Sequence, residues 1–226
     1  PVTAPDEFTE IVEVVVEESE IEEGYVKIIV TRGSDDHNFT IPARSALQPN
    51  VLVYGKPIDL NAIEKVQSGV NCITLDDDRG HHCDILSLNQ LNNMMARAEA
   101  QKKNCYDAVF IKDGLLTEAS HSNVCIVKAG VIWTPATNEH MIRGVTRSLV
   151  LTRAAPSAGV TSIDEASEPV RFEDMMTAEE VFLTNSQDGI IPVLSIDGNP
   201  IGGGKVGDVT KKIQEHYAHL MEDGLP

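Results

Sequence analysis

Three polar segments of this chain contain residue types that bind anions or move protons. Glu118 lies within residues 117–123, between two apolar stretches, where a carboxylate is either an exposed loop charge or a buried functional acid. Residues 143–146 lead into a predicted helix, and residues 184–187 follow a predicted strand. Turns rich in glycine, hydroxyl or amide groups expose unpaired N–H groups at such places and bind anions. Ordinary turn chemistry is the simpler account of each segment taken alone, so spacing leaves both interpretations open.

Two further clusters lack what a nucleotide or metal site requires. Residues 202–205, three glycines and a lysine, lack the first glycine and the hydroxyl residue of a phosphate-binding P-loop. His81 and His82 precede Cys83, but adjacent side chains of a strand point to opposite faces and do not easily share one ion. The sequence therefore predicts neither a nucleotide site nor a metal site at these positions.

Charge and hydropathy exclude two classes of partner. The chain has 226 residues with 18 Lys+Arg against 35 Asp+Glu, a formal net charge of −17, which argues against nucleic acid. Its apolar stretches are strand-sized, far below the roughly 20 residues that cross a bilayer, so we expect no membrane partner. The four cysteines form no C-x-x-C pair. Free thiols in a reducing intracellular compartment, the cytoplasm or an organelle matrix, are the simpler account.

The hydrophobic periodicity predicts a mixed α/β chain in two parts. Helical spacing of apolar residues predicts helices over residues 8–16, 87–103, 144–155 and 209–221. Short apolar runs predict strands over residues 25–31, 51–54, 72–75, 107–111, 123–128, 131–134, 181–184 and 192–196. Met94 and Met95 are interpreted as core residues. Residues 55–59 form a connector, which divides the chain into a small domain (1–58) and a larger domain (59–226).

Ordered motifs along nearly the whole chain resemble the fold-type IV family of pyridoxal-phosphate enzymes. The motifs lie at residues 26–33, 83–89, 117–124, 141–147 and 179–184. The family comprises D-amino-acid transaminases, branched-chain aminotransferases and aminodeoxychorismate lyases, and the resemblance is strongest to the D-amino-acid transaminase branch. It implies a two-domain α/β (α+β) fold and a homodimer. Family members begin with further N-terminal strands, so we expect the small domain to be incomplete here.

The resemblance also implies roles for the three polar segments. Glu118 matches the acid that pairs with the pyridine nitrogen and keeps it protonated, so that the ring acts as an electron sink. The residues that match the holders of the cofactor phosphate are Gly144, Val145, Thr146, Thr184 and Ser186. The residues expected on the substrate side are His37, Ser120 and His121.

One departure from the family lies at the catalytic lysine. The family motif Asp-Ile-Lys-Ser-Leu-Asn corresponds to residues 84–89 of this chain, in which Leu86 stands at the lysine position. Leucine has no amine, so it neither forms the Schiff base nor shuttles the proton. The Arg and His that trap the substrate carboxylate in the D-amino-acid branch align with His37 and Phe39. We therefore expect this cationic trap to be weakened or lost.

Three interpretations follow from the resemblance and its departures. The first is a catalytically impaired or inactive homologue that binds pyridoxal phosphate non-covalently if Leu86 is native. The second is an active aminotransferase or lyase-type enzyme, acting on an amino acid and a 2-oxo acid. It would have an engineered residue 86 or a substitute lysine, for which Lys27 is the candidate. The third is a structural subunit of a larger assembly.

Overall fold

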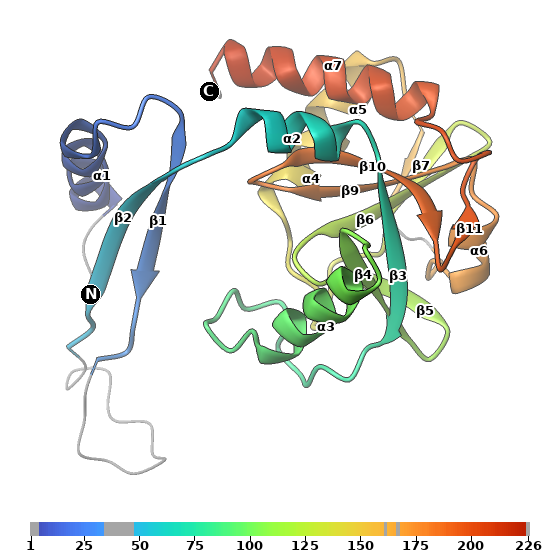
Figure 1. Ribbon diagram of the computed structural model, residues 1–226, viewed down its shortest axis with the longest axis horizontal. Helices are drawn as coiled ribbons and strands as arrows, with labels where there is room; N and C mark the ends of the chain where they lie inside the picture. The colour runs from blue at the N-terminus through green and yellow to red at the C-terminus, as the bar shows by residue number, and fades with distance from the viewer. Residues whose placement is uncertain (1–4, 34–47, 161, 166–167, 225–226) are drawn as a thin grey trace. The chain divides into compact units, whose positions relative to one another are not determined.

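The computed structural model describes residues 5–33, 48–160, 162–165 and 168–224 (Figure 1). His37 and Phe39 lie outside the described residues. The chain divides into two compact units, Pro1–Leu60 and Asn61–Pro226. Within the described residues, no helix has both the length and the apolar character that a bilayer crossing requires.

The first unit is a helix packed on a two-stranded antiparallel sheet. α1 (Pro5–Ser19) leads into β1 (Gly24–Val30), which pairs along its whole length with β2 (Val51–Pro57). The helix packs against β2 and, less extensively, against β1. β2 therefore extends into residues 55–57, which the sequence assigned to a connector.

The buried side of α1 is narrower than predicted. Helical spacing placed Ile11 and Val16 on the packed face together with Phe8, Val12 and Val15. Phe8, Val12 and Val15 are half-buried, whereas Ile11 and Val16 are 36% and 48% exposed. A two-stranded sheet is too small to cover the whole apolar face of a helix, so part of that face remains open in this unit.

The second unit is built on one curled, mixed sheet. Its described strands follow the spatial order β5-β4-β3-β10-β9-β6-β7-β8, and β11 pairs with β10. β3 pairs in parallel with both β4 and β10, whereas β9 pairs antiparallel with β10 and β6. β5 also approaches β6, which draws the sheet toward closure (Figure 1). The strands are β3 (Val70–Asp76), β4 (Asp107–Lys112), β5 (Leu115–Ala119), β6 (Asn123–Lys128), β7 (Val131–Trp133), β8 (Ile163–Asp164), β9 (Glu180–Asn185), β10 (Gly189–Ile196) and β11 (Asn199–Pro200).

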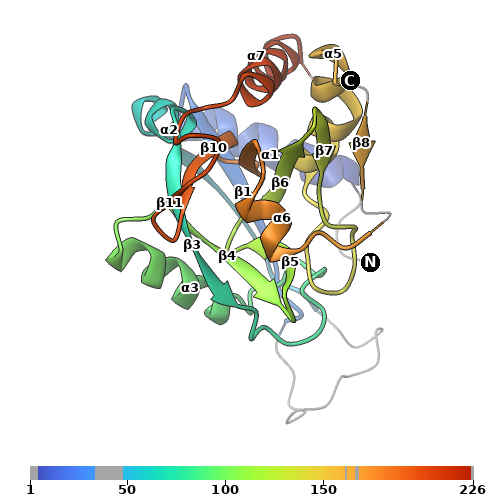
Figure 2. The same cartoon turned by 90° about the vertical axis from the view of Figure 1, so that its right-hand side faces the viewer.

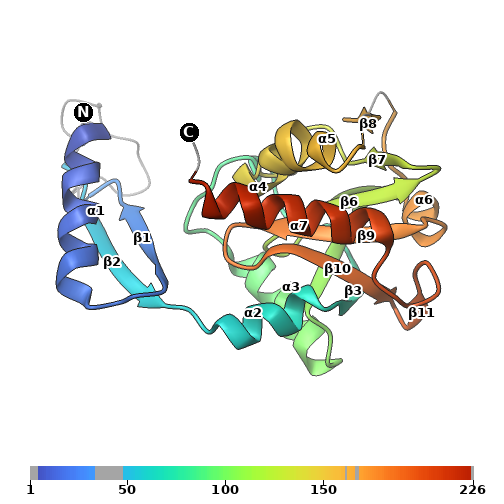
Figure 3. The ribbon, with the colours of Figure 1, turned by 90° about the horizontal axis from the view of Figure 1, so that it is seen from above.

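Helices cover the outside of this sheet in two groups. α3 packs on β3 and β4 (Figure 2), whereas α7 packs on β9 and β10 beside α5 (Figure 3). The helices are α2 (Leu60–Gln67), α3 (Leu91–Lys102), α4 (Val145–Leu149), the π-helical turn η2 (Val150–Ala154), α5 (Ala155–Ser157), α6 (Phe172–Met176) and α7 (Asp208–Glu222). α4, η2 and α5 follow one another without a gap and form one helical segment.

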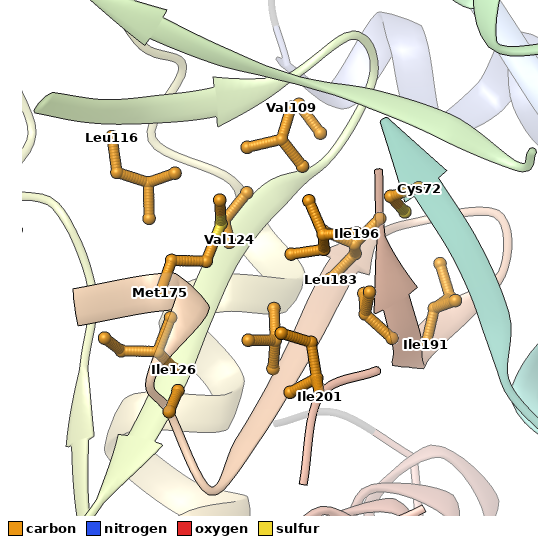
Figure 4. Packing of buried hydrophobic residues seen from close by; sticks show 14 of the residues in the cluster. Cys72, Val109, Leu116, Val124, Ile126, Met175, Leu183, Ile191, Ile196 and Ile201 are labelled. Atoms are coloured by element: carbon orange, nitrogen blue, oxygen red, sulfur yellow. The ribbon is translucent and has the colours of Figure 1, made fainter. Parts of the chain in front are cut away.

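Alternate residues of the central strands point into different parts of the core. Val124 and Leu183 belong to the inner cluster (Figure 4), whereas their neighbours Cys125 and Phe182 pack against the η2, α5 and α7 side. Ala100 of α3 belongs to a third cluster with residues of β3 and β4. β6 and β9 are therefore buried on both faces, which explains their continuous apolar sequences.

α3 begins later than predicted, and its methionines lie outside the core. Residues 87–90 are irregular, and the helix starts at Leu91. Met94 and Met95 are 68% and 63% exposed, while the helix buries Ala96 and Ala100 against the sheet. The prediction of buried methionines was wrong because small alanines allow the helix to pack closely on β3 and β4, which turns its larger side chains outward.

Two other segments also differ from the prediction. The sequence left Thr117 and Glu118 in a polar segment between strands, but both lie in β5, where they are buried. The predicted helix from Gly144 does not stop at Pro156, which instead lies near the start of α5. The segment ends at Ser157, because Gly159 adopts the left-handed φ of 83° that terminates helices.

The glycine-rich turn after β11 offers a matched test of packing. Gly202 and Gly203 both have positive φ, 53° and 80°. A Cβ on Gly202 would lie 2.0 Å from the carbonyl oxygen of Glu179, whereas a Cβ on Gly203 would have nothing within 4 Å. We expect Gly203→Ala to lower the free energy of unfolding by about 1–2 kcal/mol. Gly202→Ala should lower it by about 2–5 kcal/mol, because overpacking adds to the same backbone strain. Chemical denaturation measures both losses, and equal losses would contradict a rigid contact with Glu179.

Candidate functional site

A cavity of about 420 Å³ lies at one edge of the sheet in the second unit. The end of β5, the start of β6, the end of β9 and the start of α4 meet there. Most of the residues singled out from the sequence line this cavity: Leu86, Glu118, Ser120, His121, Gly144, Val145, Thr184 and Ser186.

The other predicted residues lie elsewhere. Thr146 follows Val145 in α4 and is 3% exposed, but it does not line the cavity. Lys27 is exposed on β1 of the first unit, opposite Tyr54. His37 lies outside the described residues. The structure thus brings together the candidates of the second unit, apart from the buried Thr146.

Glu118 is a buried acid with three hydrogen-bond donors. Its side chain is 4% exposed, and the guanidinium of Arg79 donates to Oε1. The backbone N–H of Ile142 donates to Oε2 at 3.0 Å, and the side-chain amide of Asn123 does so at 3.4 Å. Of the two interpretations left open by the sequence, the buried acid is therefore the correct one.

Arg79 is the centre of this charged cluster, although it is not among the residues singled out from the sequence. It is 7% exposed and donates to Asp77 through Nε at 2.9 Å and Nη2 at 2.8 Å, and to the carbonyl of His140 at 2.9 Å. Its guanidinium lies 4.3 Å from the ring centroid of Phe110, a cation–π contact. The hydroxyl of Thr117 donates to Asp77 at 2.9 Å. An Arg–Gly pair after an acidic run is typical of a solvated turn, so no local signal marks Arg79 as buried.

The cluster holds two carboxylates and one guanidinium, and so has an excess of negative charge. Burial raises the pKa of Glu118 and the Arg79 guanidinium lowers it, and the balance leaves a pKa of about 7. Asp77 makes the bidentate pair with Arg79, so despite burial its pKa lies below the usual value. A cationic N–H group of a ligand beside Glu118 would balance the charge of these three side chains.

Asn123 positions the segment that faces Glu118. Its side-chain amide donates to the carbonyl of Ile142 at 2.7 Å, and its Oδ1 accepts the N–H of Gly144 at 3.1 Å. A Cβ on Gly144 would lie 2.2 Å from that Oδ1, so the close approach requires glycine. The N–H of Ser148 donates to the carbonyl of Gly144 at 3.0 Å. The N–H groups of residues 145–147 precede this first helical bond and lack helical partners.

Residues 184–186, the end of β9 and the first residue of the turn that follows it, are here called the anion turn, and they present a hydroxyl group without a partner. Thr184 is 2% exposed, and its buried Oγ1 has no hydrogen bond to any described residue. A buried unpaired hydroxyl costs free energy unless a ligand or water satisfies it. With Ser186 and the free N–H groups at the start of α4, Thr184 forms a set of donors suited to an anion.

His121 adds a titratable side chain to the cavity. Its Nδ1 lies 3.0 Å from Asp107, a fully buried acid that also accepts the hydroxyl of Ser120. Burial disfavours the charged imidazole, but hydrogen bonds with Asp107 and Asp188 outweigh this effect, so the pKa of His121 lies above its usual value. Asp107 begins β4 and shows no sequence signal for this role.

Leu86 contributes only hydrocarbon to the wall of the cavity. It lies in the irregular segment that precedes α3 and is 80% exposed. None of the residues that line this cavity is a lysine. The described wall therefore offers no primary amine to a bound ligand.

Comparisons with known proteins agree in family and fold. The model of the amino-transferase class IV family matches residues 1–196. The D-alanine aminotransferase of Staphylococcus aureus (strain N315) is 32% identical over 217 residues, which are 96% of this chain and 75% of that protein. The branched-chain amino acid aminotransferase of Escherichia coli has a TM-score of 0.83 at 23% identity, over 97% of this chain and 73% of that one. The branched-chain amino acid aminotransferase of Thermobaculum terrenum, in its PLP-form, has a TM-score of 0.80 at 20% identity, over 97% and 71% of the two chains.

We expect Glu118 to make the stability of the protein depend on pH. Its pKa of about 7 in the folded protein lies above the ordinary 4.5. The stability that it contributes is therefore complete below pH 4.5 and is lost as the pH rises through 7. Relative to the non-titrating variant Glu118→Gln, the wild-type protein should lose up to about 3 kcal/mol of unfolding free energy across this range. Urea denaturation at a series of pH values measures the difference, and parallel curves for the two proteins would contradict it.

Proposed function

Because this chain belongs to the aminotransferase class IV family, we propose that it is a D-amino-acid transaminase-like homologue that binds pyridoxal phosphate non-covalently and does not transaminate. The observation that carries this proposal is Leu86 in the cavity wall, at the position where the family resemblance places the Schiff-base lysine. The D-alanine aminotransferase relatives support the D-amino-acid branch. The PLP-form of the Thermobaculum terrenum enzyme supports the class of cofactor.

The residues of the cavity fit this cofactor at both of its polar ends. The buried pair of Glu118 and Asp77 exceeds the charge of Arg79 by one negative charge, which a protonated pyridine nitrogen balances. The unpaired hydroxyl of Thr184 and the hydroxyl of Ser186 provide donors to a phosphate. A volume of about 420 Å³ falls in the usual range for small-molecule sites.

The protein's own contribution is to hold charge and protons in place. When bound, pyridoxal phosphate supplies a ring that withdraws electron density from the substrate carbon. Glu118 keeps a proton at the ring nitrogen, and Arg79 with the N–H of Ile142 already orients its carboxylate before a ligand arrives. Because these dipoles are preorganised, ligand binding requires no rearrangement of the acid.

Leu86 removes the amine on which transamination depends. A lysine there would bond to the cofactor aldehyde and then carry a proton to and from the substrate carbon. An isobutyl group does neither, so an amino acid or a 2-oxo acid entering the cavity would meet no general base at this position. Lys27, the substitute considered from the sequence, is exposed in the first unit.

The exposed apolar residues around Leu86 favour a second function, as a subunit that binds another copy of this chain. Six residues of this segment are between 57% and 80% exposed, and we call them the 85–95 patch: Ile85, Leu86, Leu88, Leu91, Met94 and Met95. Contiguous apolar patches of this kind mark protein interfaces. A homodimer is the assembly that the family resemblance implies, and a larger assembly with an unlike chain is the alternative.

We expect the purified chain to bind added pyridoxal phosphate without a covalent bond in the cavity. Borohydride reduction followed by peptide mapping should find no modified cavity residue, and a mixture of D-alanine and 2-oxoglutarate should show no amino transfer. Leu86→Lys should become labelled at residue 86, because its amine would lie in the cavity wall. Leu88→Lys is the matched control, since Leu88 is 66% exposed in the same segment but does not line the cavity.

Two results would overturn parts of this proposal. Turnover by the unchanged chain, with reduction onto Lys27 or another lysine, would show an active enzyme and name the substitute. Absence of saturable binding by the wild-type chain and by Leu86→Lys would exclude the cofactor.

We expect the wild-type chain to sediment as a homodimer at micromolar concentration. Met95→Glu should shift it toward the monomer, because a charge in the 85–95 patch opposes burial. Met221→Glu on α7, where the methionine is 50% exposed, is the control and should leave the dimer intact. A wild-type monomer would contradict the homodimer, and a stoichiometric unlike partner would favour the larger assembly.

A further inference from the structure

His121 connects the wall of the cavity to two acids, one on a strand and one in a turn. Its Nδ1 lies 3.0 Å from Oδ2 of Asp107 at the start of β4, and its Nε2 lies 3.9 Å from Oδ2 of Asp188 in the turn between β9 and β10. The hydroxyl of Tyr106 lies 3.3 Å from the same Nε2 and donates to Asp188. The imidazole thus bridges β4 and the β9–β10 turn.

The imidazole of His121 also lies close to the anion turn. Asn185 is the middle residue of that turn, and its Nδ2 lies 3.4 Å from Nε2 of His121. Its Oδ1 accepts the N–H of Asp188 at 2.7 Å, and its amide donates to the hydroxyl of Ser122 at 3.1 Å. The positions of the Thr184 backbone and of its unpaired hydroxyl therefore depend on Asn185 and Asp188, both of which lie close to His121.

The charges around the ring are balanced when His121 is protonated. Asp107 and Asp188 contribute two negative charges, and Arg97 of α3, which contacts the ring, contributes one positive charge. The imidazolium contributes the second positive charge and carries an N–H on both nitrogens, whereas the neutral ring carries only one. Loss of the proton therefore removes the positive charge of His121 between the two acids, which keep the neutral hydroxyl donors Ser120 and Tyr106. Despite burial and the like charge of Arg97, the two acids raise the pKa of His121, and His121 lowers the pKa of Asp188.

We propose that His121 is a positioning residue for the anion turn, and that phosphate binding in the cavity is coupled to protonation of its imidazole. The second half of this statement rests on the proposed function, because it takes a phosphate monoester as the ligand. The positioning role of His121 concerns only residues of the chain and does not depend on a ligand. Protonated His121 attracts the carboxylate of Asp188, and the backbone N–H of Asp188 donates to Oδ1 of Asn185, the middle residue of the turn. As the pH rises through the pKa of His121, the turn loses this support and its donors lose their alignment.

The experiment uses the full chain, pyridoxamine 5′-phosphate as the probe, and two readouts. Calorimetry gives the dissociation constant from about pH 6.5, the ordinary pKa of histidine, up to about pH 9. Hydrogen exchange gives the protection factors of the backbone amides of residues 185–189 without ligand over the same range. The variants are His121→Gln, Asp188→Asn, and His219→Gln as the control, since His219 is exposed on α7.

The wild-type protein and His219→Gln should bind about tenfold more weakly at the upper end of the range, a usual size for coupling between two sites. Their protection at residues 185–189 should fall over the same interval. His121→Gln should show weak binding and low protection throughout the range. Any pH dependence of binding that this variant retains belongs to the ligand's phosphate, which ionises near about pH 6, and to Glu118. Asp188→Asn should move the midpoint to lower pH, because one of the two acids that favour the imidazolium is gone.

The outcomes separate this inference from the proposed function. Protection that does not vary with pH, or that is the same in His121→Gln as in the wild-type protein, would overturn the positioning role whether or not the probe binds. Binding whose pH dependence is unchanged in His121→Gln would overturn the coupling. If the protection of residues 185–189 changes with pH but neither the wild-type protein nor any variant binds the probe, the proposed cofactor is overturned. That result would still support His121 as the residue that positions the turn.

Discussion

The burial of one guanidinium between two carboxylates is the constraint on which the cavity depends. Arg79 joins the loop after β3 to Glu118 at the end of β5 and to the carbonyl of His140. Breaking such a buried pair by removing one partner typically costs about 3–5 kcal/mol, because a charge is left uncompensated. Arg79, together with Asn123, therefore holds Glu118 and the segment before α4 in one geometry. The acid that faces the ligand is oriented by the fold and not by the ligand.

The sequence predicted the polar residues that line the cavity better than the buried charged residues that lie behind them. Gly144 and Thr184 lie at the ends of predicted elements, and Glu118 lies in a polar segment between two of them, so residue type and position sufficed to select them as candidates. The family resemblance supplied their roles. Arg79 and Asp107 were missed because burial of a charge depends on what packs over it from elsewhere in the chain. No spacing rule predicts that a charged residue in an acidic turn, or at the first position of a strand, will be buried by other segments of the chain.

The same limit explains which elements were predicted. β6 and β9 are apolar on both faces, and runs of this kind identify buried strands without further information. β5 carries a threonine and a glutamate whose partners lie on other segments, so its sequence resembles a loop. Periodicity identified an apolar face on α3, but it does not specify what covers that face. Alanines pack against the sheet there, and Met94 and Met95 are exposed.

The exposure of Leu86 separates folding from chemistry at this position. The side chain is 80% exposed and belongs to no core cluster, so neither a lysine nor a leucine is needed there for the unit to fold. A replacement here changes the chemistry of the cavity wall without removing a core contact. The scaffold that positions Glu118 and Thr184 is therefore independent of whether residue 86 carries an amine.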